Sequence, residues 1–159
     1  MSVGDPHEHD EIPDAQFIKA KDDPRFQAIL ARGFRVNYNY DIPYLGGYSL
    51  DGTIIYIDRD VPTSIRYKRQ RIPLRPAGIV AGICVHEHWE KTAMLVFGWD
   101  YTRSHMLANR AEDDFVTDKL GMKMALYNGI WDPLIKISEH KLKRKDISWP
   151  PDLDKTPYK

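Results

Sequence analysis

Two stretches in the second half of the chain have apolar residues at helical spacing. In the stretch from about Ala77 to Phe97, one stripe at about 100° per residue contains Ile79, Ile83, His86, Glu90, Ala93 and Phe97. In the stretch from about Tyr101 to Leu120, the corresponding stripe contains Tyr101, His105, Ala108, Glu112 and Phe115. Gly98 is placed to end the first helix and Asp100 to cap the second. The pattern therefore predicts an antiparallel pair of helices with a very short connection.

The residues before this helix pair alternate between apolar and polar, which is the period of a half-buried β-strand. One such run is Phe34–Tyr40, and two more, Tyr48–Leu50 and Thr53–Ile57, flank Asp51-Gly52. Asp-Gly between two such runs predicts a two-residue hairpin turn, because both central residues need positive φ. We therefore expect a small antiparallel sheet of about three strands ahead of the first long helix.

Two further helices are predicted from Asp-Pro pairs, since Asp caps free N–H groups and Pro suits the first helical position. The first follows Asp23-Pro24 and ends at Gly33, and the second follows Asp132-Pro133 and continues to about Arg144. Residues 58–76 contain three prolines, so we expect a loop there.

Together these elements predict an α+β fold of one domain, residues 23–145. Its small antiparallel sheet packs on the antiparallel helix pair, with a short helix towards each end. Residues 1–22 have few apolar anchors and are expected to form a flexible N-terminal arm. We interpret His7, Glu8 and His9 in this arm as solvated rather than as metal ligands. Residues 146–159 form a Pro-rich tail that either wraps over a neighbour or stays mobile.

Composition narrows the class of protein. The 159 residues include 23 Lys and Arg and 23 Asp and Glu, so the formal net charge is +0. This balance argues against a dedicated nucleic-acid binder, although it leaves room for a local basic patch. Such a cluster lies between Arg66 and Arg75. We interpret it as a solvated loop, with binding of an anionic partner as the alternative.

The chain also lacks membrane signals. No apolar run approaches the ~20 residues that span a bilayer, and the acidic, polar start is unlike a signal peptide. The single Cys84 excludes an internal disulfide bond and fits a reducing compartment. We therefore expect a cytoplasmic protein without membrane contact.

Four titratable side chains lie on the two apolar stripes: His86, Glu90, His105 and Glu112. Burying an unpaired carboxylate is costly, so these groups must be paired, hydrated or bound to a cation. His86 and Glu90 lie one turn apart and can hold one Zn²⁺ ion from the same side. The second helix supplies the third ligand. His105 and Glu112 lie ~10 Å apart along its axis, so one binds the metal and the other supports it or orients substrate.

Glu87 follows the first candidate ligand, which gives the pattern H-E-x-x-E from His86 to Glu90. It lies ~100° round the helix from His86, beside the expected metal position. Zinc lowers the pKa of bound water to about 7, so a carboxylate there suffices as the base that activates this water.

A metal-free explanation stays open. The four groups can instead form a buried, hydrogen-bonded and ion-paired cluster with Lys91 or Arg110. His88 points to another side of the helix and is expected to be partly exposed. Cys84 is interpreted as a small core residue rather than a ligand or nucleophile.

A hairpin, an H-E-x-x-E helix and a second helix with His or Glu resemble the minimal zincin metallopeptidase arrangement. The chain also resembles small proteins encoded by tailed phages and prophages, through Ile42–Arg59 (IPYLGGYSLDGTIIYIDR), His86–Lys91 (HEHWEK) and His105–Glu112 (HMLANRAE). The resemblance covers about residues 34–120. It implies a minimal zincin-like fold, a peptide or protein substrate and, for a phage protein, assembly partners. The location would then be the host cytoplasm or the virion.

The resemblance also implies a substrate-binding edge. In zincins the strand before the metal helix offers an open edge to a peptide, and Thr53–Ile57 or Phe34–Tyr40 would play that part here. This chain departs from H-E-x-x-H in having Glu90 at the second His position. A carboxylate ligates zinc, but it lowers the positive charge of the site and so weakens its Lewis acidity.

These observations lead to three functional hypotheses. The first is a zinc-dependent hydrolase, specifically a peptidase, in which Glu87 activates a metal-bound water and His105 or a Tyr stabilises the oxyanion. The second is a non-enzymatic phage or prophage protein, structural or host-interacting, with a structural metal site or a metal-free polar cluster. The third is a di-metal protein that uses Glu87, Glu90, His105 and Glu112. It ranks last because two helices lack the four-helix shell of such sites.

Overall fold

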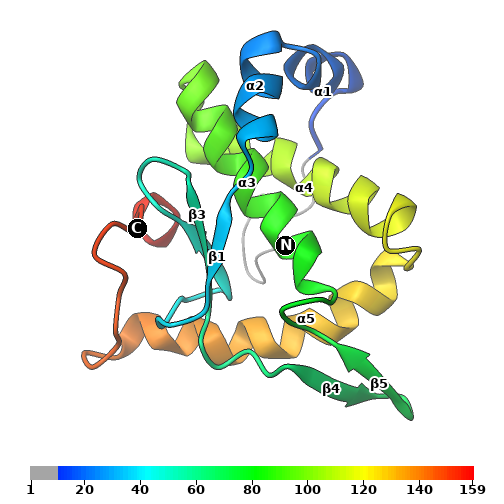
Figure 1. The fold of residues 1–159 in the computed structure, drawn as a ribbon, viewed down its shortest axis with the longest axis vertical. Coiled ribbons are helices and arrows are strands. Elements are labelled where there is room, and N and C mark those ends of the chain that lie inside the picture. Colours follow the sequence, from blue (N-terminus) through cyan, green and yellow to red (C-terminus); the bar gives the residue numbers. More distant parts are fainter. Residues whose placement is uncertain (1–10) are drawn as a thin grey trace.

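The centre of the molecule is an antiparallel pair of helices, α3 (Val80–Phe97) and α4 (Tyr101–Asp118) (Figure 1). The structure is a computed structural model and describes residues 11–159. Gly98 ends α3 in the left-handed conformation with φ 66°, and the Asp100 side chain caps α4 by accepting a hydrogen bond from the N–H of Arg103. The predicted helix pair, its connection and both of its signals are therefore confirmed.

Two short helices, α1 (Asp14–Lys21) and α2 (Pro24–Arg32), cover one end of this pair. Asp23 caps α2 as predicted, and the fully buried Phe26 packs on Trp89 of α3 at a ring distance of 5.1 Å. Helix α1 lies inside the stretch predicted as an arm. Its two buried residues, Phe17 and Ala20, attach it to the core, and the polar composition of the segment gave no indication of this packing. His7, Glu8 and His9 lie outside the described residues.

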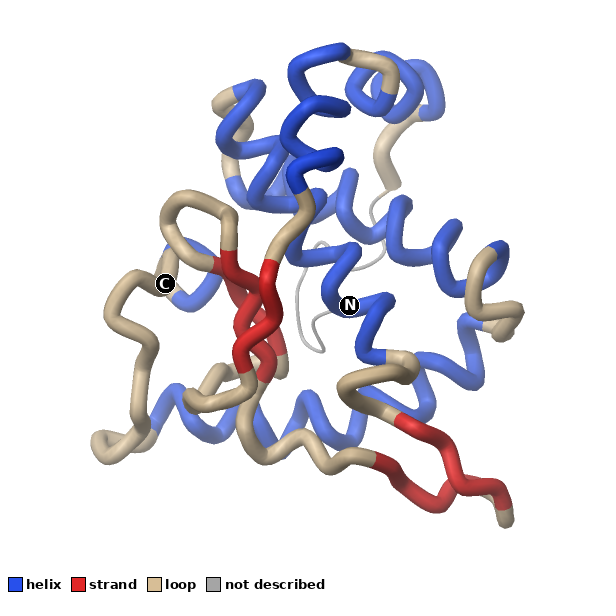
Figure 2. Tube along the Cα trace, in the orientation of Figure 1, coloured by secondary structure: helices blue, strands red, loops and turns tan. Residues whose placement is uncertain are grey.

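A three-stranded sheet lies along one side of α3 (Figure 2). Its order is β1 (Arg35–Asn37), β3 (Ile54–Ile57), β2 (Gly46–Tyr48). The β2–β3 pair is antiparallel, which confirms the predicted hairpin, but β1 runs parallel to β3. The prediction of an entirely antiparallel sheet is wrong because the chain crosses from β1 to the far side of β3 before it forms β2.

The β2–β3 connection is longer than the predicted two-residue turn. Gly52 alone adopts positive φ, at 75°, and its N–H donates to the carbonyl oxygen of Ser49. The carboxylate of Asp51 accepts hydrogen bonds from Ser49 and Thr53, so it closes the loop through its side chain.

A second hairpin, β4 (Ser64–Tyr67) and β5 (Gln70–Pro73), occupies part of the stretch predicted as a loop. Its turn residues, Lys68 and Arg69, both adopt positive φ, at 47° and 69°. The prediction failed because charged residues stand where a two-residue turn normally has Asn or Gly. Pro73 is the last residue of β5, a position that tolerates the missing N–H. The hairpin projects from the body of the molecule at the end opposite α1 and α2.

Helix α5 (Met124–Glu139), followed by a short 3₁₀ segment (His140–Lys143), runs across the molecule below the sheet and the start of α3 in Figure 1. It begins well before the predicted start at Asp132, and Pro133 lies inside it. The helix continues through Pro133 because its buried face stabilises both sides of that residue; this face consists of Tyr127, Ile130, Trp131 and Ile135. The main hydrophobic core lies between the sheet, α3 and α5.

The C-terminal segment wraps over the body of the protein. Leu153 is buried and forms an isolated antiparallel bridge with Ser49, and Lys91 on α3 makes a 2.9 Å ion pair with Asp154. A 3₁₀ turn (Thr156–Tyr158) follows, and the Tyr158 hydroxyl donates to the carbonyl oxygen of Gly46 at 2.8 Å. Of the two outcomes left open for this tail, the structure therefore has the wrapped one.

The observed class is mixed α+β, as predicted. Among the described residues, no helix combines the length and hydrophobicity that crossing a membrane would require.

Candidate metal centre

Helices α3 and α4 bring three potential metal ligands together in the protein interior. His86 and Glu90 lie one turn apart on α3, and His105 reaches them from α4. The His86 Nε2 atom lies 3.1 Å from Glu90 Oε2 and 3.2 Å from His105 Nδ1. The third side of the triangle, from His105 Nδ1 to Glu90 Oε2, is 2.8 Å. One ion can therefore contact all three atoms at once.

The size of this triangle can be compared with a zinc site. Zinc bonds to His nitrogen and carboxylate oxygen are about 2.0–2.2 Å long, which in tetrahedral geometry separates neighbouring ligand atoms by about 3.3–3.5 Å. The observed separations of 2.8–3.2 Å need to widen by only a few tenths of an ångström. The three ligand atoms therefore lie close to the spacing that a zinc ion requires.

Glu112 fixes the orientation of the His86 ring. Its Oε1 accepts a hydrogen bond from His86 Nδ1 at 3.0 Å, which leaves the Nε2 lone pair of neutral His86 directed at Glu90 and His105. A lone pair that faces a carboxylate oxygen at 3.1 Å is repulsive unless a proton or a cation lies between them. Of the two α4 groups, His105 thus joins the inner triangle, while Glu112 supports it from behind His86.

Two tyrosines hold the carboxylates in place. The Tyr48 hydroxyl, from β2, donates to Glu90 Oε1 at 2.7 Å, and the Tyr127 hydroxyl, from α5, donates to Glu112 Oε2 at 2.6 Å. Glu112 therefore has one oxygen for His86 and one for Tyr127, whereas Glu90 has one oxygen for both histidines and one for Tyr48. The sequence analysis missed both tyrosines, because they come from elements far from the helix pair.

Gly82 was the available sequence signal for Tyr127. A Cβ atom at Gly82 would lie 2.9 Å from Tyr127 Cζ, so a larger residue on this turn of α3 would displace the ring. Gly82 lies in the first turn of α3, and a glycine inside a helical pattern often marks close packing.

The charges of the site are coupled through these contacts. Burial lowers the pKa of His86, but its hydrogen bonds to Glu112 and Glu90 outweigh this effect and raise the pKa. Burial raises the pKa of Glu90, but its contacts with His105 and His86 lower it below the ordinary value. The pKa of His105 is lowered, chiefly by burial. The cluster therefore favours a positive charge held between Glu90 and Glu112.

Glu87 lies on the neighbouring side of α3, beside the triangle rather than in it. It packs against β2, where a Cβ atom at Gly46 would lie 2.9 Å from Glu87 Oε1. It is more exposed than His86 or Glu90. Burial, followed by the negative charge of Glu90, raises the pKa of Glu87. A divalent cation in the triangle would oppose that shift and favour the carboxylate.

Four other residues have no part in the triangle. His88 is buried against Phe34, with a ring distance of 4.7 Å, so the expectation of partial exposure is wrong. The connection from α2 to β1 covers this histidine, and burial lowers its pKa. Cys84 is buried, as expected for a core residue, and burial raises its pKa to about 12. Lys91 pairs with Asp154, and Arg110 with Asp14 and Asp114, so neither neutralises the cluster.

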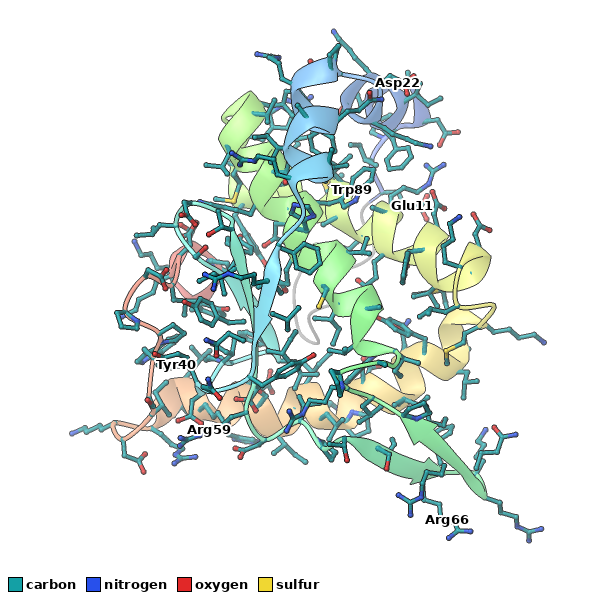
Figure 3. All side chains as sticks on the ribbon, in the orientation of Figure 1. Glu11, Asp22, Tyr40, Arg59, Arg66 and Trp89 are labelled. Carbon is teal, nitrogen blue, oxygen red and sulfur yellow. The ribbon has the colours of Figure 1, made fainter. Side chains whose placement is uncertain are left out.

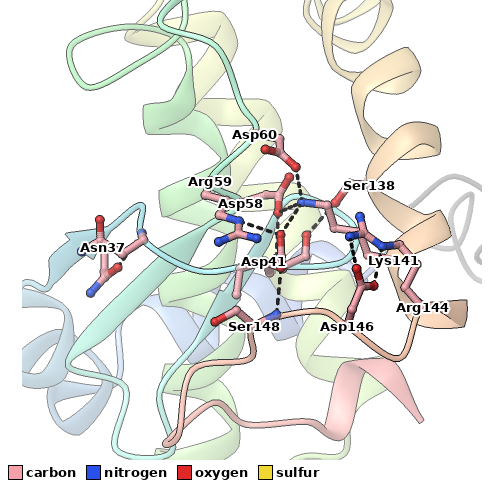
Figure 4. Close-up of polar contacts among 12 residues, drawn as sticks. Asn37, Asp41, Asp58, Arg59, Asp60, Ser138, Lys141, Arg144, Asp146 and Ser148 are labelled. Carbon is pink, nitrogen blue, oxygen red and sulfur yellow. Dashed lines mark hydrogen bonds and ion pairs between the residues drawn. The ribbon is translucent and has the colours of Figure 1, made fainter.

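A second group of carboxylates, Asp41, Asp58 and Asp60, also lies close enough to hold an ion. Figure 4 shows that the ammonium group of Lys141 lies among them, at 2.9, 2.6 and 2.6 Å. This lysine supplies the positive charge that the three carboxylates need. We therefore interpret this group as a structural ion-pair network that ties α5 and its 3₁₀ extension to the sheet.

Comparison of the chain with protein-family models, with curated proteins and with solved structures gives no match.

Proposed function

We propose that this protein is a zinc-dependent hydrolase that holds one Zn²⁺ ion with His86, Glu90 and His105. The observation that carries the proposal is the triangle of three ligand atoms with sides of 2.8–3.2 Å, built on two helices and backed by Glu112. When a ligand histidine donates its second ring N–H to a carboxylate, the carboxylate fixes the orientation of the ring and raises its basicity. This arrangement is the minimal zincin-like feature of the fold.

The number of ligands favours catalysis over a purely structural ion. Structural zinc sites generally have four protein ligands, whereas catalytic sites have three and leave one position for water or substrate. The triangle contains three, and Glu87 lies beside it instead of completing the set. Its place outside the triangle also argues against the di-metal hypothesis.

Zinc bound here would polarise a substrate carbonyl and lower the pKa of water towards 7. Glu87 is the proton acceptor in the proposed reaction, because its carboxylate lies one residue beyond His86, beside the triangle, and is less buried than the three ligands. We assign oxyanion stabilisation to Tyr101, because His105 belongs to the triangle. The Tyr101 hydroxyl lies 3.3 Å from His105 Nδ1.

The sheet restricts how a peptide substrate could bind. β3 is the central strand, so Thr53–Ile57 offers no edge, and the prediction that it binds substrate is wrong. β1 is an edge strand, but β2 is the strand that contacts Glu87. The C-terminal segment already pairs with β2, through Leu50 to Asp152 and Asp154 to Tyr48. A peptide that reaches Glu87 by strand addition must therefore displace residues 152–158.

Burial favours one alternative, in which the metal stabilises the fold of a non-enzymatic protein, for example a phage assembly component. The exposed fractions of the residues concerned are very low, at 6% for His86, 1% for Glu90 and 2% for His105. Activity assays on a metal-loaded protein separate this alternative from the hydrolase.

The test of the proposal is the substitution Glu87→Gln. We expect this variant to retain the zinc content of the wild type and to lose at least 100-fold in hydrolysis of fluorescein-labelled casein or a quenched peptide library, because the proton acceptor is gone. Glu11→Gln is the matched control, since Glu11 is exposed and belongs to no site. Stoichiometric zinc without hydrolysis by the wild type would contradict the hydrolase and favour the structural alternative.

A further inference from the structure

The projecting β4–β5 hairpin gathers positive charge in a chain that is neutral overall. Four of its residues, Arg66, Lys68, Arg69 and Arg71, are exposed. Figure 3 shows side chains with blue nitrogen atoms, including the labelled Arg66, extending into solvent from this end of the molecule. The metal centre and the proposed hydrolysis make no use of this feature.

The hairpin separates its apolar and basic side chains onto opposite faces. Ile65 pairs with Ile72 across the strands, and both pack against the main core. The next pair along the ladder is Arg66 with Arg71, which therefore faces away from the body. Two like charges directly opposite each other destabilise an antiparallel pair.

The tip of the hairpin shows a second unfavourable feature. Lys68 and Arg69 occupy the left-handed region, with φ of 47° and 69°, where Asn-Gly is the favoured pair. Within residues 11–159, no carboxylate forms an ion pair with any of the four cations. Arg71 instead donates to the hydroxyl of Ser64 at 2.9 Å, and Lys68 lies over the Tyr67 ring at 5.6 Å. An anionic ligand would relieve the repulsion.

We propose that the outer face of the β4–β5 hairpin binds the phosphate backbone of a nucleic acid. Three of the four cations are arginines, whose planar guanidinium groups match phosphate oxygens in two-point contacts. A two-stranded ribbon also has the dimensions that enter the major groove of a duplex.

The composition of the face argues against a folded acidic protein as the partner. Protein interfaces have an apolar, aromatic-rich centre that excludes water. The large apolar side chains of the hairpin, Ile65, Tyr67 and Ile72, are half-buried and pack inward. The outward face therefore offers charge without an apolar centre, which suits a backbone of phosphates.

Binding of this kind has a characteristic salt dependence. Each phosphate contact contributes about −0.9 to the slope of log K against log salt concentration on a duplex. Four cations therefore set a limit of about −3.6. The affinity is high enough to measure at low salt and is largely lost at a few hundred millimolar salt.

The test measures fluorescence anisotropy of the full chain with fluorescein-labelled duplex DNA, single-stranded DNA and RNA over a series of salt concentrations. The double variant Arg66→Gln, Arg71→Gln should bind at least tenfold more weakly at low salt and reduce the slope by about 2, since two contacts are removed. The matched control is Lys119→Gln, Lys123→Gln, which removes the same charge at exposed positions outside the hairpin and should keep the wild-type slope. Circular dichroism checks that both variants fold.

The same titration includes outcomes that overturn the proposal. Absence of binding at the lowest salt concentration would overturn it. An equal loss of affinity in the control variant would also overturn it, because it would indicate attraction to the whole protein surface. Displacement of the nucleic acid by poly-glutamate at equal charge concentration would assign the face to an acidic protein instead. Comparison of the duplex, single-stranded and RNA arms then shows which kind of backbone the hairpin binds.

Discussion

At the scale of single residues, the candidate site depends on groups that never touch the proposed ion. Glu112 holds His86 through Nδ1, and Tyr127 holds Glu112 in turn. The H-E-x-x-E pattern predicted His86, Glu90 and the position of Glu87, because those relations are fixed by the geometry of one helix. It could not decide between His105 and Glu112, because that choice depends on how α4 is rotated and shifted against α3.

The role of Glu112 leads to a prediction on metal affinity. Glu112→Gln keeps an acceptor for the His86 Nδ1–H but removes the negative charge that makes the ring more basic. We expect zinc affinity to fall by about 10–100-fold, with the fold retained. Competition with a chromogenic chelator measures this change, and Glu139→Gln on α5 is the control. Unchanged affinity in Glu112→Gln would show that this carboxylate is only a core hydrogen-bond partner of Tyr127.

At the scale of elements, short-range sequence signals predicted the helix ends and the helix connection. They did not predict the strand pairings between segments that are distant in the sequence. The Gly98 and Asp100 signals gave the connection of the helix pair because each acts within one turn. The parallel pairing of β1 with β3 depends on a crossover that no local pattern records. The β4–β5 hairpin was not predicted because its turn residues, Lys68 and Arg69, adopt positive φ, which Asn and Gly favour.

The strain at that tip is testable. Replacing Lys68 by Asn and Arg69 by Gly supplies residues that adopt positive φ readily. The left-handed conformation costs an ordinary residue about 1–2 kcal/mol, so we expect this double variant to raise the free energy of unfolding by about that amount or more. Chemical denaturation measures the change, with Lys119→Asn as the control. Loss of stability in the double variant would contradict the view that the tip is strained.

At the scale of the whole molecule, the C-terminal segment closes the sheet beside the candidate site. Asp154 of this segment pairs with Lys91 of α3, and Asp152 accepts a hydrogen bond from the hydroxyl of Tyr56 on β3. The sequence analysis left the fate of this tail open. Its anchoring depends on one buried ion pair, on hydrogen bonds from the Tyr56 and Tyr158 hydroxyls and on a few backbone hydrogen bonds, which composition alone does not reveal.

The Lys91–Asp154 pair predicts a pH-dependent effect on stability. Burial raises the pKa of Asp154, but hydrogen bonds from Thr156 and the ion pair with Lys91 outweigh this and lower the pKa below 3.8. The pair therefore stabilises the fold above pH 3.8, and this contribution is lost as the pH falls through the lowered native pKa.

The variant Asp154→Asn tests this assignment, because it leaves Lys91 buried without its counter-charge. We expect a loss of about 3 kcal/mol in the free energy of unfolding at pH 7, from the cost of an unpaired buried charge. The difference from the wild type should shrink as the pH falls below 3.8. Urea denaturation at several pH values measures it, and a difference that stays constant with pH would contradict the ion-pair explanation.

The metal content of the purified protein shows whether His86, Glu90 and His105 hold zinc. Protein prepared without chelators and without a metal-binding tag is analysed by inductively coupled plasma mass spectrometry, beside His86→Ala and the matched control His140→Ala at an exposed histidine. We predict about one zinc per chain in the wild type and in His140→Ala, because the three-ligand site is intact. His86→Ala should contain none. Wild-type protein without zinc that also fails to bind added zinc would contradict the account and leave His86, Glu90, His105 and Glu112 as a metal-free polar cluster.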